Sequence, residues 1–150
     1  MPQNIVVDAS CLIILERIGE LDILKKMYGE ILITPEIANE YGLQLPDWIK
    51  INDIDIARHK KLLNSLLDSG EKSVIALAKE LNGLAVLDDL KARNFANELQ
   101  VEYTGTMGLI VEAKQNGIID SVETLLDKID QTNFRLSDEL RVKILNMAGE

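Results

Sequence analysis

The feature that most limits the possible folds is the regular alternation of short apolar segments with longer segments of helical period. The short segments are rich in Val, Ile and Leu and are predicted as strands at 4–7, 31–33, 48–51, 84–87 and 101–103. Between them, positions such as Val74, Leu77 and Leu81 recur at the spacing of one buried helical face. This alternation predicts one three-layer α/β domain, whose mainly parallel sheet of about five strands is flanked by helices.

Two of the predicted strands are almost wholly apolar. The runs NIVV and LAVL, residues 4–7 and 84–87, lack the alternation of a half-exposed strand, so both are expected at the centre of a parallel sheet. Thr34 followed by Pro35 is typical of a helix N-cap and the first helical position. Gly83 is predicted to end the helix that precedes the second run.

The chain shows no repeat, low-complexity tract or linker across its 150 residues, a length suited to a single domain. Ser137 is predicted to begin a last amphipathic helix in which Leu140, Ile144 and Met147 share a face. That face packs either on the body of the protein or on a second subunit. Residues from about 119 to 150 are therefore expected to be a helical extension of one domain spanning 1–150.

Charge and composition limit the partners and the location. The net charge is -9, from 16 Lys and Arg against 25 Asp and Glu, which opposes attraction to phosphate unless part of the acidic excess binds cations. No apolar run approaches the roughly 18 residues of a membrane helix, and the N-terminal sequence lacks the features of a signal peptide. The single Cys11 excludes an internal disulfide. These features favour a cytoplasmic protein without membrane association.

Acidic side chains stand where predicted strands end or predicted helices begin. Asp8 directly follows the first strand, and Asp88 and Asp89 follow the fourth. Glu40 lies on one predicted helix, and Glu71 stands in the first turn of another. Ligands of an open parallel sheet bind beyond the carboxyl ends of its strands, near the switch in strand order. The aspartates are therefore expected at one edge if the first and fourth strands are neighbours.

Each of these carboxylates also has a purely structural interpretation. Asp8 can cap the helix that follows it. Glu71 has the spacing of a capping box with Asp68, in the string DSGE. Glu40 alone is typical of a solvated helix residue. One member of the Asp-Asp pair is expected to cap the next helix, which leaves the other without a structural role.

Together, these segments resemble the ordered motifs of PIN domains. The matching strings are NIVVDASCLIIL at 4–15, PEIANE at 35–40, GEKSVIALA at 70–78, LDDLKAR at 87–93 and VEYTGT at 101–106. The third string has Glu71 where many members of the family have Asp. The resemblance spans about residues 5–117 and is greatest to a PIN-like branch of bacterial and archaeal proteins, often encoded beside small antitoxin-like proteins.

The resemblance implies a metal-dependent ribonuclease that hydrolyses phosphodiesters, as in toxin–antitoxin pairs of the VapC type. Matched by motif, the acidic set is Asp8, Glu40, Glu71 and Asp89, with Asp88 the rival for the last place. Asp8, Glu71 and Asp89 or Asp88 would bind Mg²⁺ or Mn²⁺, hard cations that prefer oxygen ligands. The family's spacing assigns the ligand role to Asp89 and makes Asp88 the cap or a more peripheral acid.

Other matched positions imply contacts to the substrate. Ser10 matches a small hydroxyl residue near the metal, and Thr104 and Thr106 match hydroxyls of the fifth-strand motif. Helix capping is the alternative for both threonines. Lys91 and Arg93 follow the fourth motif and are expected to contact phosphate. The implied partners are an RNA substrate, a small antitoxin protein and a second copy of the chain in a homodimer.

Two other functions stay open. The first is an inactive PIN-like module that binds RNA or a partner protein without cleaving it. The second is a phosphatase with Asp8 as the nucleophile, because a strand ending in Asp also opens such domains. Haloacid dehalogenase-like phosphatases usually carry a second Asp two residues on, where this chain has Ser10, and the chain has no glycine-rich phosphate loop.

Overall fold

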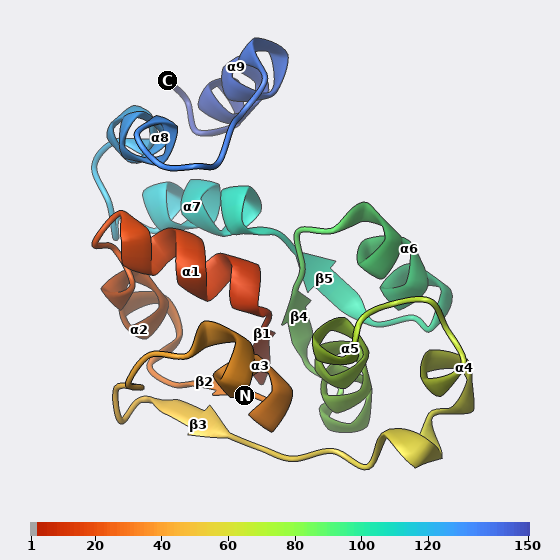
Figure 1. The fold of residues 1–150 in the computed structure, drawn as a ribbon. Coiled ribbons are helices and arrows are strands. Elements are labelled where there is room, and N and C mark those ends of the chain that lie inside the picture. The colour runs from red at the N-terminus through yellow and green to blue at the C-terminus, as the bar shows by residue number, and fades with distance from the viewer. Residues whose placement is uncertain (1–2) are drawn as a thin grey trace.

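The protein is described by a computed structural model covering residues 3–150. Its centre is a parallel sheet with the strand order β3-β2-β1-β4-β5 (Figure 1). The strands are β1 (Ile5–Val7), β2 (Ile31–Ile33), β3 (Ile49–Ile51), β4 (Leu84–Val86) and β5 (Glu102–Thr104). The prediction of a single α/β domain with a parallel sheet of five strands is confirmed, and each strand boundary lies within one residue of its predicted place.

Helices connect the strands and cover both faces of the sheet. They are α1 (Ala9–Arg17), α2 (Asp22–Tyr28), α3 (Pro35–Tyr41), the 3-10 turn η1 (Ile56–Arg58), α4 (Lys60–Leu63), α5 (Ser69–Leu81), α6 (Leu90–Glu98), α7 (Thr106–Gln115), α8 (Val122–Asp130) and α9 (Asp138–Met147). In Figure 1, α1 and α7 lie on one side of the sheet, while α5 and α6 lie on the other. Helix α3 packs against both α1 and α5, so it links the two sides near the ends of the central strands.

The apolar runs form the centre of the sheet, as their composition predicts. Ile5, Val6 and Val7 of β1 are at most 2% exposed, and β1 pairs with β4 in the register Val7 to Val86. The chain leaves β1 toward β2 and β3, then returns across the sheet to β4. The connections from β1 and β4 therefore depart to opposite faces, and the switch in strand order falls between these two strands.

The predicted helix ends are partly correct. Thr34 caps α3 by accepting a hydrogen bond from the Ile37 amide at 3.3 Å, as expected. The prediction that Gly83 ends α5 is wrong, because Asn82 takes the left-handed conformation with φ 51°. Gly83 is needed for a different reason. A Cβ at this position would lie 2.4 Å from the backbone oxygen of Asn4, so only glycine allows this close approach to the start of β1.

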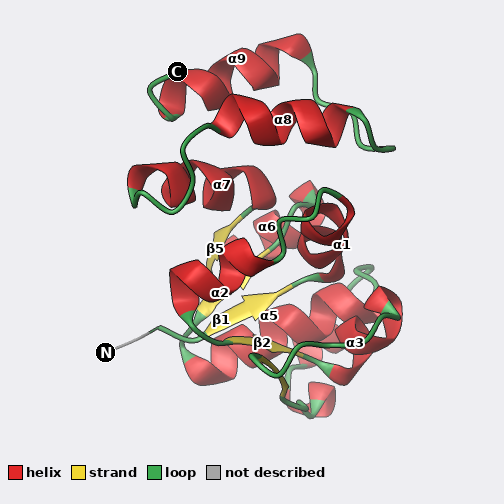
Figure 2. Ribbon diagram, turned by 90° about the vertical axis from the view of Figure 1, so that its left-hand side faces the viewer, coloured by secondary structure: helices red, strands yellow, loops and turns green. Residues whose placement is uncertain are grey.

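The last helices extend the molecule away from the sheet. Figure 2 shows α7, α8 and α9 stacked in succession, with α9 farthest from the strands. Ser137 caps α9 by accepting from the Leu140 amide at 3.1 Å, as predicted. Ile144 is 3% exposed, whereas Leu140 and Met147 on the same face are 41% and 54% exposed. The apolar face of α9 is thus only partly covered by the rest of the chain.

Among residues 3–150, none of the helices combines the length and the apolar character needed to cross a membrane.

Candidate active site

A pocket of about 360 Å³ opens at the carboxyl edge of the sheet, where β1 and β4 end. Its lining consists of carboxylates and one hydroxyl: Asp8, Ser10, Glu40, Asp68, Glu71, Asp88 and Asp89. The structure therefore brings together every acidic residue considered from the sequence, and it adds Asp68. No basic side chain belongs to this lining within the described residues 3–150.

Asp8 is the most buried of these acids, at 8% exposed. It is also the N-cap of α1, and its Oδ1 accepts a hydrogen bond from the Ala9 amide at 2.8 Å. Burial, assisted by the charges of Glu40, Glu71 and Asp68 and opposed by the Ala9 hydrogen bond, raises the pKa of Asp8 to about 7. Asp8 is thus both a helix cap and a wall of the pocket, so neither interpretation excludes the other.

The first turn of α5 supplies two carboxylates through a capping box. Asp68 Oδ1 accepts from the Glu71 amide at 2.8 Å, and Glu71 Oε1 accepts from the Asp68 amide at 3.2 Å. Burial raises the pKa of Glu71, and the charges of Asp68, Asp89 and Glu40 add to this rise. The sequence predicts Asp68 as a capping partner, and the structure adds it to the pocket lining. The DSGE spacing was the available signal, because N-cap and N3 carboxylates share one end of a helix.

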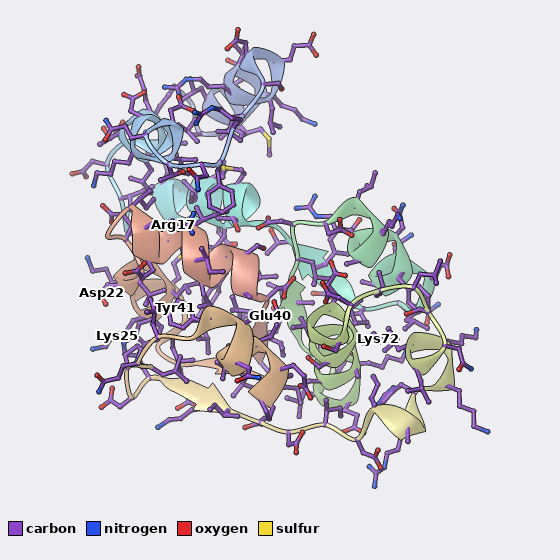
Figure 3. The ribbon with its side chains drawn as sticks, viewed as in Figure 1. Arg17, Asp22, Lys25, Glu40, Tyr41 and Lys72 are labelled. Carbon is purple, nitrogen blue, oxygen red and sulfur yellow. The ribbon has the colours of Figure 1, made fainter. Side chains whose placement is uncertain are left out.

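Glu40 reaches the pocket from α3, which lies between α1 and α5 (Figure 3). A Cβ on Gly70 would lie 2.3 Å from Glu40 Oε1 and 3.0 Å from Ile37 Cδ1. The absence of a side chain at residue 70 therefore allows the Glu40 carboxylate to approach the first turn of α5. Burial and the charge of Asp68 raise the pKa of Glu40. Glu40 is consequently more than a solvated helix residue.

Of the two aspartates after β4, Asp89 and not Asp88 caps the next helix. Asp89 is the N-cap of α6, because its Oδ2 accepts from the Ala92 amide at 3.1 Å. Asp88 accepts from the Thr106 amide at 2.7 Å, from Thr106 Oγ1 at 2.6 Å and from Ser10 Oγ at 2.9 Å. The assignment of the cap to Asp88 is therefore wrong. Both side chains line the pocket, so either could be a ligand of a bound cation.

The hydroxyl residues of the fifth-strand motif do not cap α7, since Gly105 occupies that position. Thr106 is fully buried as the first residue of α7, and its hydroxyl is directed to Asp88. Thr104 ends β5 and lines a neighbouring groove. Gly105 is closely approached by Arg93, because a Cβ on Gly105 would overlap the guanidinium group. The capping alternative for both threonines is wrong.

Of the two predicted phosphate contacts, only Arg93 lies beside the site. Its Nε donates to the Leu87 carbonyl at 2.7 Å, and its guanidinium lies over the Tyr103 ring with 5.7 Å to the centroid. Lys91 is exposed on α6 and belongs to neither the pocket lining nor the groove lining.

The pocket offers only oxygen donors, which suit Mg²⁺ or Mn²⁺. Across residues 3–150, no group of three or more His, Cys, Asp or Glu side chains is already arranged to hold a metal ion. Capping hydrogen bonds and mutual repulsion both favour a spread arrangement of carboxylates. Burial, and to a smaller extent the charges of neighbouring carboxylates, raises the pKa values of Asp8, Glu40 and Glu71. Donor type and charge therefore fit a divalent cation that would draw the carboxylates inward.

Comparison with known proteins agrees with this arrangement. A family model described as a PIN domain matches residues 4–150. The chain belongs to the PIN-domain family. PIN domains are generally nucleases and typically use divalent metal ions, so the family favours a nuclease over the phosphatase alternative. No curated protein matches this PIN domain.

Proposed function

We propose that this PIN domain is a ribonuclease that depends on Mg²⁺ or Mn²⁺. The observation that carries the proposal is the convergence of carboxylates from four separate segments on one pocket at the strand-order switch. Nucleases often use such oxygen-rich sites to hold the cations that stabilise a reacting phosphodiester. Family membership supports the same class of activity.

The carboxylates that line the pocket have distinct roles in this proposal. Asp8, Asp88, Glu71 and Asp89 are the proposed ligands of the cation. Mg²⁺ or Mn²⁺, when bound, supplies electrostatic stabilisation of the phosphoryl oxygens and the leaving oxygen. Asp88 is oriented by hydroxyl and amide donors, so it provides a fixed oxygen at the edge of the sheet.

Glu40 is proposed to orient the attacking water and to accept its proton. Its carboxylate lines the pocket from a different helix than the other acids, and its raised pKa makes it a stronger base than an ordinary glutamate. Ser10 holds Asp88 and lies at the rim of the same pocket, where its hydroxyl can also contact the substrate phosphate.

RNA cleavage by wild-type protein and by Asp8→Asn tests the proposal. Wild type should cleave labelled RNA with Mg²⁺ or Mn²⁺ and lose cleavage with chelator. Asp8→Asn should reduce the rate roughly 10²- to 10⁴-fold, a loss typical for one catalytic group. Asp47→Asn, an exposed residue between α3 and β3, is the matched control and should retain the wild-type rate. Cleavage that survives both chelator and Asp8→Asn contradicts the proposal.

A PIN-like module that binds RNA without cleaving it is the second candidate. The observation that favours it is that no three His, Cys, Asp or Glu side chains among residues 3–150 are already arranged to hold a metal ion. RNA binding with no metal-dependent cleavage by wild type would support this candidate instead.

We also propose that the nuclease is the toxin of a toxin–antitoxin pair, inhibited by a small antitoxin protein and assembled as a homodimer. The resemblance of the fourth motif and following strand to antitoxin-linked PIN-like proteins supports this role. Expression of wild type, but not of Asp8→Asn, should then arrest growth. Sedimentation of the purified chain measures the dimer independently.

A further inference from the structure

A larger groove of about 670 Å³ adjoins the acidic pocket. It runs between α7, α9 and the end of β5. Ser10 and Asp88 line both cavities, so the groove begins where the pocket ends. A polymer whose reacting bond lies in the pocket would have its neighbouring units in this groove.

The charges of the two cavities differ in sign. The groove is bordered by Arg93, Arg135 and Lys143, and Asp88 is its single acidic lining residue in the described part of the chain. Within residues 3–150, none of these three cations forms an ion pair with a carboxylate. In a chain of net charge -9, such a group of uncompensated cations is complementary to a phosphate backbone.

The groove also offers aromatic and apolar surface. Tyr103 is 39% exposed beneath the Arg93 guanidinium, and Phe134 lines the groove from the segment between α8 and α9. Unpaired bases stack on aromatic rings and on arginine planes. The volume lies within the roughly 300–1,000 Å³ of sites for small organic groups. These features suit splayed bases of a single strand better than a stacked duplex.

We propose that this groove binds the nucleotides of single-stranded RNA next to the bond cleaved in the acidic pocket. The proposal rests on the nuclease function proposed above. Tyr103 and Phe134 stack on bases, while Arg135 and Lys143 contact the phosphates that follow. The C-terminal helices α8 and α9 thereby form part of the substrate site. The groove gives this acidic protein a locally positive surface to which RNA binds.

Binding is measured with Asp8→Asn protein and a short, labelled, mixed-sequence single-stranded RNA, so that cleavage does not interfere. Lys143→Ala and Arg135→Ala should each weaken binding several-fold and reduce the slope of log K against log salt by about 0.7 for each lost phosphate contact. Lys50→Ala, an exposed lysine on β3 at the opposite edge of the sheet, removes the same charge and should change neither quantity.

The contribution of base stacking on Tyr103 is tested with a matched pair of variants. Tyr103→Ala should weaken binding at least about fivefold, whereas Tyr103→Phe keeps the ring and should bind like the parent. In cleavage-competent protein the same groove variants should raise KM more than they lower kcat, because they act on substrate binding.

The outcomes separate this inference from the nuclease proposal. If wild type cleaves RNA but the groove variants bind and cleave like Lys50→Ala, the groove inference fails and the nuclease stands. If RNA binding depends on the groove but no cleavage occurs, the groove stands and the nuclease fails. Loss of a dimer in Lys143→Ala or Tyr103→Ala, with unchanged RNA affinity, would assign the groove to a second copy of the chain and overturn the inference.

Discussion

Asp8→Asn should stabilise the metal-free protein near neutral pH, although it alters the centre of the site. Asn caps a helix about as well as Asp, so the hydrogen bond to the Ala9 amide can persist. The substitution removes a charge that burial and three neighbouring carboxylates make unfavourable. At 1.36 kcal/mol per pKa unit, the rise from 3.8 to about 7 corresponds to about 4 kcal/mol as an upper bound.

The sign of the pH dependence follows from this rise. The folded protein holds the Asp8 proton up to about pH 7, whereas the unfolded chain loses it near pH 4. Between these limits the folded state binds more protons, so the wild type loses stability as the pH increases. The advantage of Asp8→Asn should therefore be greatest above about pH 7 and disappear below about pH 4.

Thermal melts with chelator at about pH 8 and about pH 4 measure the effect. For a chain of this size, 4 kcal/mol corresponds to a Tm increase of roughly 10 °C. Asp47→Asn is the control for loss of an exposed carboxylate. Mn²⁺ at a hundred times Kd should reduce the difference in stability between the two proteins, since binding adds about 2.7 kcal/mol to the folded wild type and the mutant loses most of this gain.

Two results would refute the reasoning. A lower Tm for Asp8→Asn than for wild type at about pH 8 without metal would show that the Asp8 charge does not destabilise the folded protein. Equal Mn²⁺-induced shifts in both proteins would show that Asp8 does not bind the cation, and the metal-dependent function would fall with it.

Three further predictions concern positions around the pocket and the C-terminal helices. Thr106→Val should lower the free energy of unfolding in urea by about 1.5 kcal/mol, because a buried hydroxyl no longer donates to Asp88. Gly70→Ala should weaken Mn²⁺ binding in calorimetry, because the new Cβ displaces the Glu40 carboxylate, whose negative charge attracts the cation although Glu40 is not a proposed ligand; an unchanged Kd would show that this charge does not contribute. Glu150→Gln should lower the Tm at neutral pH but not near pH 2. Hydrogen bonds from the Val122 amide and from Lys114 lower the pKa of Glu150 from 4.5 to about 2, so the stability they contribute is full above about pH 4.5 and is lost as the pH falls through about 2.

Much of the fold could be predicted because its signals are local. The apolar runs of β1 and β4 identify the central strands directly. Thr34, Ser137 and the Asp68–Glu71 box mark helix starts through hydrogen bonds within a few residues. Once strand ends and first turns are known, a parallel sheet places the acids at one edge.

The errors involve contacts that no local pattern contains. Asp88 is held by Thr106, which is 18 residues away, so its role depends on the pairing of β4 with β5. Once Asp88 is bound there, Asp89 is the residue left to cap α6. Gly83 is likewise needed because the backbone of Asn4, near the N-terminus, approaches it closely, and not because it ends a helix. The groove could not be predicted at all, since it depends on how α9 packs against α7.

The side chains of the proposed cation site differ in length and in how they are held. Asp8 and Asp88 are short side chains fixed by hydrogen bonds at the ends of β1 and β4. Glu40 and Glu71 each have one more methylene, and burial together with the charges around them raises their pKa values. A cation would lower this repulsion most for the groups that can move. In the proposed site, the aspartates would therefore define where the ion binds, and the longer glutamates would adjust their side chains toward it.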